Sequence, residues 1–299
     1  MISFSPTFLD NYASCPRRAY WSSVRRLTPA KPNFNLIIGE AVHAGLEAWF
    51  GGKGSADAVS REAGKSLKKN MPEGMTAEEE QQFAHADIVV RAMLDGYMQY
   101  WKDDKKQLTV MAVEFPFEGI RIAPGVRVSG RIDMLCTDSH SRALVFDHKT
   151  KSAIGEGYLL ALPLSYQTAL YPAAIERLYG ERIHSVVYDI IRKSALRQGK
   201  AESAQQFFQR VREGYLSQPE SYFLRQPIRL TPRRCRAAKE ALVGLARVAR
   251  VSYLHKDDRS YWPMTPANCA QFGTCEFLPL CLRGDRPDTL MFYRKREGA

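Results

Sequence analysis

Asp133, Asp147 and Lys149 are the residues of the segment Val128–Lys151 whose types and spacing could support hydrolytic chemistry. Two carboxylates buried close together are costly unless a cation compensates their charge. Carboxylate oxygens and water form a site that suits a hard dication such as Mg²⁺ or Mn²⁺. A lysine beside such a site can orient an attacking water or neutralise charge on a phosphate.

A simpler interpretation of the same residues needs no metal. Asp133 and Asp147 could be acids of edge strands or turns, and Lys149 could pair with one of them. Short motifs of this kind have high false-positive rates. The three residues alone therefore do not decide between a metal site and an ordinary ion pair.

The local pattern predicts that an antiparallel hairpin positions these residues. Two apolar runs, Val128–Cys136 and Arg142–Thr150, are joined by the polar segment Thr137–Ser141. Side chains alternate across a strand, so Asp147 and Lys149 are expected to point to the same face.

Other segments predict helices and strands around this hairpin. The expected helices are a short one starting at Ser5-Pro6 and those over Leu36–Phe50, Ala56–Lys69, Thr76–Asp103, Pro163–Tyr179, Ala201–Tyr215 and Pro232–Leu254, with strands over Leu108–Phe117 and His184–Ile191. We find no repeat and no low-complexity linker. We therefore expect one domain over residues 1–299, with five successive segments: an N-terminal segment over residues 1–35, a helical wall over 36–107, a catalytic core over 108–200, C-terminal helices over 201–262 and a cysteine-containing tail over 263–299.

Four short motifs follow one another along the chain. They are Gly39-Glu40-Ala41-Val42-His43, Gly130-Arg131-Ile132-Asp133, Asp147-His148-Lys149 and Gln167-Thr168-Ala169-Leu170-Tyr171. This order resembles the RecB-like branch of the PD-(D/E)xK nuclease superfamily, from about Ser3 to Cys281. The resemblance implies an α/β fold: a restriction-endonuclease-like core with a central mixed β-sheet flanked by helices, a helical insertion, and an iron-sulfur staple that joins the termini.

The resemblance also implies roles for individual residues. His43 would be a metal ligand together with Asp133, Asp147 and the backbone carbonyl of His148, although a histidine on an apolar helix face is more often a buried residue with a satisfied partner. Lys149 would position the attacking water.

Three further residues are candidates on the same ground. Glu114 could contact the metal, position water or form a simple salt bridge. Gln167 and Tyr171 share one helix face because they are four residues apart. The resemblance implies that they face the cleft and hold DNA backbone or support the metal ligands; without it, Tyr171 would be core filler and Gln167 a surface residue.

Four of the six cysteines suggest a second metal site. Cys269, Cys275 and Cys281 crowd into a short tail, and Cys15 is the natural fourth ligand. The arrangement resembles the [4Fe-4S] site of the CRISPR-adaptation nucleases and of AddB-type nuclease subunits, although the first gap is longer here than in the commoner family tail. Four thiolates can also bind zinc, so both occupants remain open. Cys136 and Cys235 are expected to be ordinary residues.

Composition favours a polyanionic partner. The chain has 43 Lys and Arg against 32 Asp and Glu, a formal charge of +11, which suits nucleic acid. No apolar window is long enough to cross a bilayer, and the first residues lack the pattern of a secretion signal, so we expect a cytoplasmic protein without a membrane partner. No ATP-binding P-loop is present, so any helicase partner would be a separate chain.

These observations lead to one expected function and two rivals. The expected function is a metal-dependent deoxyribonuclease, an exonuclease acting on single-stranded DNA or DNA ends in recombination, repair or related DNA processing. The first rival is a non-cutting DNA-binding or scaffold subunit of a recombination complex. The second is a zinc-stapled protein of RNA processing.

Overall fold

The computed structural model describes residues 1–52, 54–71, 74–270 and 273–296. The chain forms two compact units, each assembled from separate stretches. Unit 1 comprises residues 1–32, 117–130 and 235–299, and unit 2 comprises residues 33–116 and 131–234. The expected single domain over 1–299 stays a prediction. The expected tail over 263–299 includes residues outside the described ranges.

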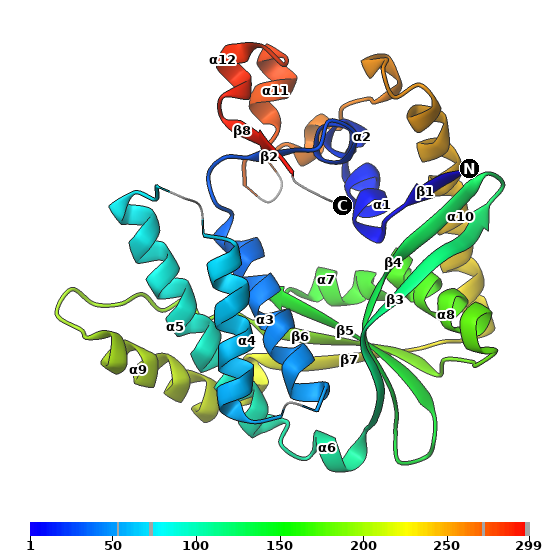
Figure 1. The fold of residues 1–299 in the computed structure, drawn as a ribbon. Coiled ribbons are helices and arrows are strands. Elements are labelled where there is room, and N and C mark those ends of the chain that lie inside the picture. The colour runs from blue at the N-terminus through cyan, green and yellow to red at the C-terminus, as the bar shows by residue number, and fades with distance from the viewer. Residues whose placement is uncertain (53, 72–73, 271–272, 297–299) are drawn as a thin grey trace. The chain divides into compact units, whose positions relative to one another are not determined.

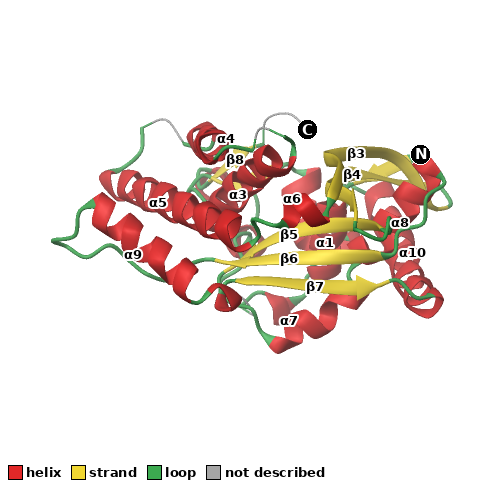
Figure 2. Ribbon diagram, turned by 90° about the horizontal axis from the view of Figure 1, so that it is seen from below, coloured by secondary structure: helices red, strands yellow, loops and turns green. Residues whose placement is uncertain are grey.

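A mixed sheet forms the centre of unit 2. Its strands are β4 (Val126–Thr137), β5 (Ala143–Lys151), β6 (Ser185–Arg192) and β7 (Phe223–Arg229). β5 pairs antiparallel with β4 and parallel with β6, which pairs antiparallel with β7; Figure 2 shows β5, β6 and β7 side by side. The expected hairpin of β4 and β5 and the mixed sheet are therefore confirmed. β6 is buried at every position except its last, as expected for a strand with neighbours on both sides.

A layer of helices packs with this sheet in unit 2. It consists of α3 (Phe34–Phe50), α4 (Ala56–Lys69), α5 (Ala77–Tyr100) and α9 (Ala204–Ser217). Each begins at a capping side chain that accepts a backbone N–H in the first turn: Asn33, Ser55, Thr76 and Ser203. Figure 1 shows α3, α4 and α5 side by side. Their apolar faces form one core with the sheet residues Met134, Cys136, Phe146, Val187 and Ile191.

Unit 2 also contains the short helices α6 (Asp104–Gln107) and α7 (Glu156–Ala161) and the longer helix α8 (Tyr166–Tyr179). The helix expected from Pro163 begins instead at Tyr166. The Ser165 hydroxyl accepts the Gln167 backbone N–H and caps the helix at that point. α8 ends at Gly180, whose φ of +70° suits glycine.

Unit 1 contains both ends of the chain. Its elements are β1 (Ile2–Phe4), α1 (Pro6–Ser14), α2 (Pro16–Ala19), the π-helical turn Tyr20–Val24, β2 (Leu27–Pro29), most of α10 (Pro232–Leu254), α11 (Leu278–Arg283), α12 (Pro287–Leu290) and β8 (Tyr293–Lys295). β1 runs parallel to β4 and β2 antiparallel to β8. Trp262, fully buried, packs edge-on against Phe8 and Tyr12.

A long strand, β3 (Thr109–Ala123), pairs with β4 and extends well beyond the expected Leu108–Phe117. The turn between β3 and β4 contains Gly125, whose φ of +76° disfavours other residues. Among the described helices, none is both long and apolar enough to cross a bilayer.

Candidate active site

Asp133 lies on β4, close to His43 of α3 and to His148 of the neighbouring strand β5. The backbone N–H of His148 donates to Oδ2 of Asp133 at 2.7 Å, and Nδ1 of His43 on α3 lies 3.6 Å from the same oxygen. The hairpin pairing of β4 with β5 brings His148 to this position. The structure therefore places three of the expected site residues in direct contact.

Glu114 completes a compact group with His43 and Asp133. One potential ligand atom from each residue lies within 4.8 Å of the other two, and among the described residues this is the group that could hold a metal ion. Glu114 has a φ of +47°, which is unfavourable for a residue with a side chain and marks a local departure from regular strand geometry. Its Oε2 also accepts from Nη1 of Arg131 at 2.9 Å.

The charges in this group fit a bound dication. Burial raises the pKa of Asp133, and the charge of Asp147 raises it further. His43 and Lys149 only partly offset this effect. An imidazole with two carboxylates is a donor set that Mn²⁺ or Mg²⁺ accepts, and a dication would relieve the repulsion between the buried acids.

Asp147 is buried and has partners on both oxygens. Its Oδ1 accepts from Nε2 of Gln167 and from the Tyr171 hydroxyl, each at 2.9 Å. Gln167 also donates to Tyr171 at 2.7 Å. The two α8 residues thus support Asp147, which is one of the two roles that the resemblance implied. Nothing in this geometry tests a contact with DNA.

Lys149 lies with its Nζ 2.6 Å from Oδ2 of Asp147, as their shared strand face predicts. Burial alone would lower the pKa of Lys149, but the charges of Asp147 and Asp133 outweigh it and raise the pKa. Lys149 is therefore an ammonium group in this arrangement of charges. It can supply positive charge and a hydrogen bond.

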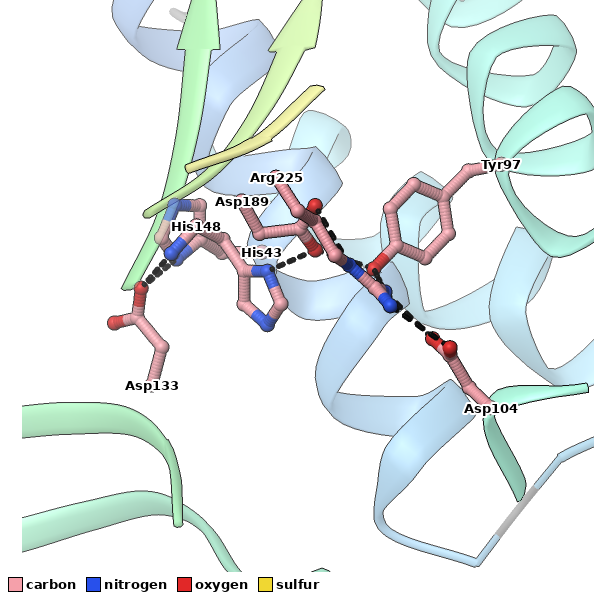
Figure 3. A network of polar contacts seen from close by, with 7 residues as sticks. All are labelled: His43, Tyr97, Asp104, Asp133, His148, Asp189 and Arg225. Atoms are coloured by element: carbon pink, nitrogen blue, oxygen red, sulfur yellow. Dashed lines mark hydrogen bonds and ion pairs between the residues drawn. The ribbon is translucent and has the colours of Figure 1, made fainter. Parts of the chain in front are cut away.

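The imidazole of His148 points away from this group toward Asp189 on β6. Nδ1 of His148 lies 3.0 Å from Oδ2 of Asp189, which also accepts from the Tyr97 hydroxyl (Figure 3). His148 and Asp189 face each other because they are register partners in the β5–β6 ladder. The side chain of His148 thus anchors the strand, while its backbone N–H holds Asp133.

Arg225 neutralises the buried carboxylate behind the site. It donates from Nε to Asp189 at 3.4 Å and forms a fork with Asp104 at 2.8 and 2.5 Å. Its guanidinium carbon lies 3.7 Å from the ring centroid of Trp101. Burial would raise the pKa of Asp189, but Arg225 and His148 hold it at about 2.

Sequence reasoning missed this supporting network of Tyr97, Asp104, Asp189 and Arg225. One signal was present: Asp189 is the single charged residue within the apolar run His184–Ile191. A buried carboxylate requires a cation or several donors, so that position predicts a partner. The identity of the partner was not visible, because Arg225 and Asp104 lie far from Asp189 in sequence.

The four candidate cysteine ligands all belong to unit 1 and none forms a disulfide. Sγ of Cys15 accepts the Thr265 backbone N–H at 3.4 Å. Burial raises the pKa of Cys281, and the charges of Cys15 and Cys275 raise it too, so these thiols are electrostatic neighbours. Within the described residues, no three of the cysteine sulfurs lie within 4.8 Å of one another.

Comparisons with known proteins give one matching family model and several similar solved structures. The family model of the PD-(D/E)XK nuclease superfamily matches residues 3–281. No curated protein matches the sequence. Similar solved structures include SSO0001, with 12% identity, a TM-score of 0.39 and coverage of 96% of this chain and 87% of that one. Another is named "Putative exonuclease", from Eubacterium rectale, with 13% identity, a TM-score of 0.45 and coverage of 94% and 87%.

Proposed function

Because this chain belongs to the PD-(D/E)XK nuclease superfamily, we propose that it is a metal-dependent deoxyribonuclease that acts on single-stranded DNA or DNA ends. The observation that supports this proposal is the compact group of His43, Glu114 and Asp133 beside the Asp147–Lys149 pair. The group joins potential metal ligands to a cation suited to phosphate. The formal charge of +11 is consistent with a nucleic-acid substrate.

The residues have distinct tasks in this proposal. The proposed ligands of Mg²⁺ or Mn²⁺ are His43, Asp133 and Asp147, with Glu114 and the His148 carbonyl as further candidates. The bound ion would polarise the phosphate and acidify a bound water. Lys149, protonated in this arrangement of charges, orients the water and stabilises charge that develops on the phosphate oxygens.

The surrounding residues keep these groups in place. Gln167 and Tyr171 fix one oxygen of Asp147, and the backbone N–H of His148 fixes one oxygen of Asp133. Fixed carboxylates matter because small displacements of catalytic groups have large effects on rate.

A DNA-binding subunit that does not cut remains the alternative. Such a protein would have no chemical need to bury two acids and a lysine together, and their burial costs free energy. The intact set therefore favours cleavage over scaffolding. Recombination, repair or related DNA processing is the proposed setting.

We also propose that Cys15, Cys269, Cys275 and Cys281 bind a [4Fe-4S] cluster, with zinc as the alternative occupant. Thiolates around one zinc ion lie about 4 Å apart, given Zn–S bonds of about 2.3 Å. In a [4Fe-4S] cluster each thiolate binds a different iron atom and the sulfurs lie farther apart. The cluster is preferred because the four cysteines resemble the cluster-binding pattern of the family. Its proposed task is to tie the two ends of the chain within unit 1.

The test of the nuclease proposal is digestion of end-labelled linear and circular DNA, single- and double-stranded, with Mg²⁺ and with Mn²⁺. We expect Asp133→Ala, Asp147→Ala and Lys149→Ala each to lower the cleavage rate at least about a hundredfold. Asp87→Ala, which removes a partly exposed acid paired with Arg91, and Lys102→Ala, which removes an exposed lysine, should cut at the wild-type rate.

Three outcomes would contradict parts of this proposal. Wild-type rates in all three site variants would refute the site assignment. Binding of DNA by the wild-type protein without cleavage under either metal would favour the scaffold alternative. Cleavage of circular DNA as fast as linear DNA would refute exonuclease action.

A further inference from the structure

A row of lysines leads away from the Asp147–Lys149 pair along the ends of two parallel strands. Lys149 and Lys151 share one face of β5, and Lys193 follows directly after β6. The Lys193 backbone N–H donates to the Lys151 carbonyl at 2.8 Å, which fixes the order of the row. All three side chains are half-buried.

The two outer lysines are held by contacts other than ion pairs, and Asp147 offsets only part of the charge of Lys151. Nζ of Lys151 lies 4.5 Å from the ring centroid of Tyr158, and Nζ of Lys193 donates to the Asn35 side chain. Neither lysine forms a salt bridge with a described acid. Half-buried ammonium groups without a carboxylate are unfavourable, and an anion in front of them would remove that cost.

Electrostatics agree with this geometry. Burial lowers the pKa of Lys151 and of Lys193, and the neighbouring cation, Lys149 or Lys151 respectively, lowers it further. The row therefore concentrates positive charge on one line that starts at Lys149. A chain of phosphates is the ligand whose spacing of charges matches such a line.

A hollow of about 500 Å³ lies next to the far end of this row. Its walls come from the start of α3, from α5 and from the loop after Lys193. They include Phe34, Gln81, Gln82, His85, Arg197 and Gln198. Phe34, which lines the hollow, is the chain neighbour of Asn35, the partner of Lys193, so the hollow begins one residue from the end of the row.

The chemistry of the hollow suits a nucleobase better than a phosphate. The rings of the hollow are His85, which stacks on Phe207 with one face, and Phe34, which packs edge-on against Phe83, and the glutamines offer amide donors and acceptors for base edges. Glu78, which accepts from Gln82 at 3.0 Å, also lines the hollow, and its charge offsets that of Arg197, so a phosphate meets no net positive charge there. An unpaired strand presents its bases to such a hollow, whereas a duplex does not.

We propose that Lys151 and Lys193 bind consecutive backbone phosphates of an unpaired DNA strand next to the cutting site, and that the hollow between α3 and α5 receives one of its bases. This inference rests on the proposed nuclease function, because it places the same substrate. It adds the strand form and the path of the strand. Lys149 and the site acids remain the residues that act on the scissile phosphate.

The experiment measures binding of labelled oligonucleotides by fluorescence anisotropy in EDTA, over a range of salt concentrations. We expect Lys151→Ala/Lys193→Ala to weaken single-strand binding and to reduce the slope of log affinity against log salt by about 1.4, because each single-strand phosphate contact contributes about 0.7. The control Lys102→Ala/Lys239→Ala removes two exposed lysines and should keep the wild-type slope. An unchanged slope in the Lys151→Ala/Lys193→Ala protein would overturn the proposal.

Abasic oligonucleotides test the hollow. The wild-type protein should bind a strand with bases about tenfold or more tighter than an abasic strand, because stacking of a base contributes that much. His85→Ala should reduce this preference, whereas Gln206→Ala, on the exposed face of α9, should not. Equal wild-type affinity for both strands, or tighter binding of duplex than of single strand, would overturn this aspect of the proposal.

These experiments distinguish failure of the proposed strand path from failure of the proposed nuclease function. Lysine-dependent binding without any cleavage by the wild-type protein would support the strand path and refute the nuclease. Normal metal-dependent cleavage with lysine-independent binding would support the nuclease and refute the strand path.

Discussion

At the scale of single residues, the candidate site depends on a carboxylate that takes no part in the proposed chemistry. Asp189 accepts from Tyr97 and Arg225 and lies 3.0 Å from the His148 imidazole. His148 in turn donates its backbone N–H to Asp133. Asp189 thereby fixes the strand position on which one site acid relies, and it does so from a fully buried location.

Asp189→Asn should therefore lower stability by about 3 kcal/mol, because it removes one partner of a buried ion pair. The pKa of Asp189 is about 2 in the folded state, so the unfolded chain binds the proton more tightly than the folded protein does. The ionised Asp189 therefore contributes its full stabilisation of the folded state above about pH 4. About 2 kcal/mol of it should be lost as the pH falls toward 2. Urea unfolding in EDTA at several pH values measures both effects.

The matched control is Asp87→Asn, which changes an exposed acid paired with Arg91 on α5. It should change stability by less than about 1 kcal/mol. The interpretation of Asp189 fails if the two variants lose equal stability, or if Asp189→Asn keeps the wild-type dependence on pH.

The sequence was enough to predict the contacts of residues that lie close together along the chain or belong to a family motif. Asp147 and Lys149 are two apart on one strand, and Gln167 and Tyr171 share a helix turn, so local geometry was enough. The partners of Asp189 could not be predicted in the same way. Tyr97, His148 and Arg225 come from α5, β5 and β7, and only the packed structure brings them together.

At the scale of elements, helices were predicted more closely than strands. The bounds expected for Ala56–Lys69 and Pro232–Leu254 agree with α4 and α10, because a long apolar face and clear caps define such helices. β1 and β7 were missed. β1 has three residues, and β7 carries Pro227 and two arginines, which a strand tolerates at a sheet edge.

The approach of α5 to α9 is an element contact that depends on one glycine. A Cβ added at Gly96 would lie 2.6 Å from Cβ of Tyr215 on α9, and neither atom can rotate away. The Tyr215 hydroxyl accepts the Ser194 backbone N–H at 2.8 Å, so this contact also holds the loop that begins at Lys193. We expect Gly96→Ala to cost about 1–3 kcal/mol in urea unfolding.

Gly64→Ala on α4 is the control for that substitution. Nothing lies within 4 Å of its added Cβ, so the better helix propensity of alanine should raise stability by up to about 1 kcal/mol. Equal effects of the two substitutions would show that helix propensity, and not the α5–α9 contact, determines the result at Gly96.

At the scale of the whole molecule, the proposed catalytic residues and the proposed cluster ligands belong to different units. The site acids and the lysine row belong to unit 2, and the four candidate cysteine ligands belong to unit 1. Sequence could not reveal this division, because residues 117–130 of the β3–β4 hairpin belong to unit 1 although both flanking stretches belong to unit 2. No composition shift marks those boundaries.

Burial raises the pKa of Cys275 and Cys281 in unit 1. Arg18 opposes this rise at Cys275, and Arg17 opposes it at Cys281. Thiolates are the form that binds iron or zinc. Because Cys15 and the late cysteines come from opposite ends of the chain, a bound group would cross-link those ends, and its loss should lower the stability of unit 1 in particular.

Protein purified without air should therefore contain iron and acid-labile sulfide in equal amounts, and Cys15→Ser should lose both. Cys235→Ser, on α10 and outside the proposed ligand set, should retain them. Limited proteolysis of Cys15→Ser should cleave within residues 1–32 and 235–296 before it cleaves unit 2, because the lost cross-link lies in unit 1. Iron retained by Cys15→Ser would refute the ligand set, and zinc in place of iron would refute the cluster while leaving the cross-link in place.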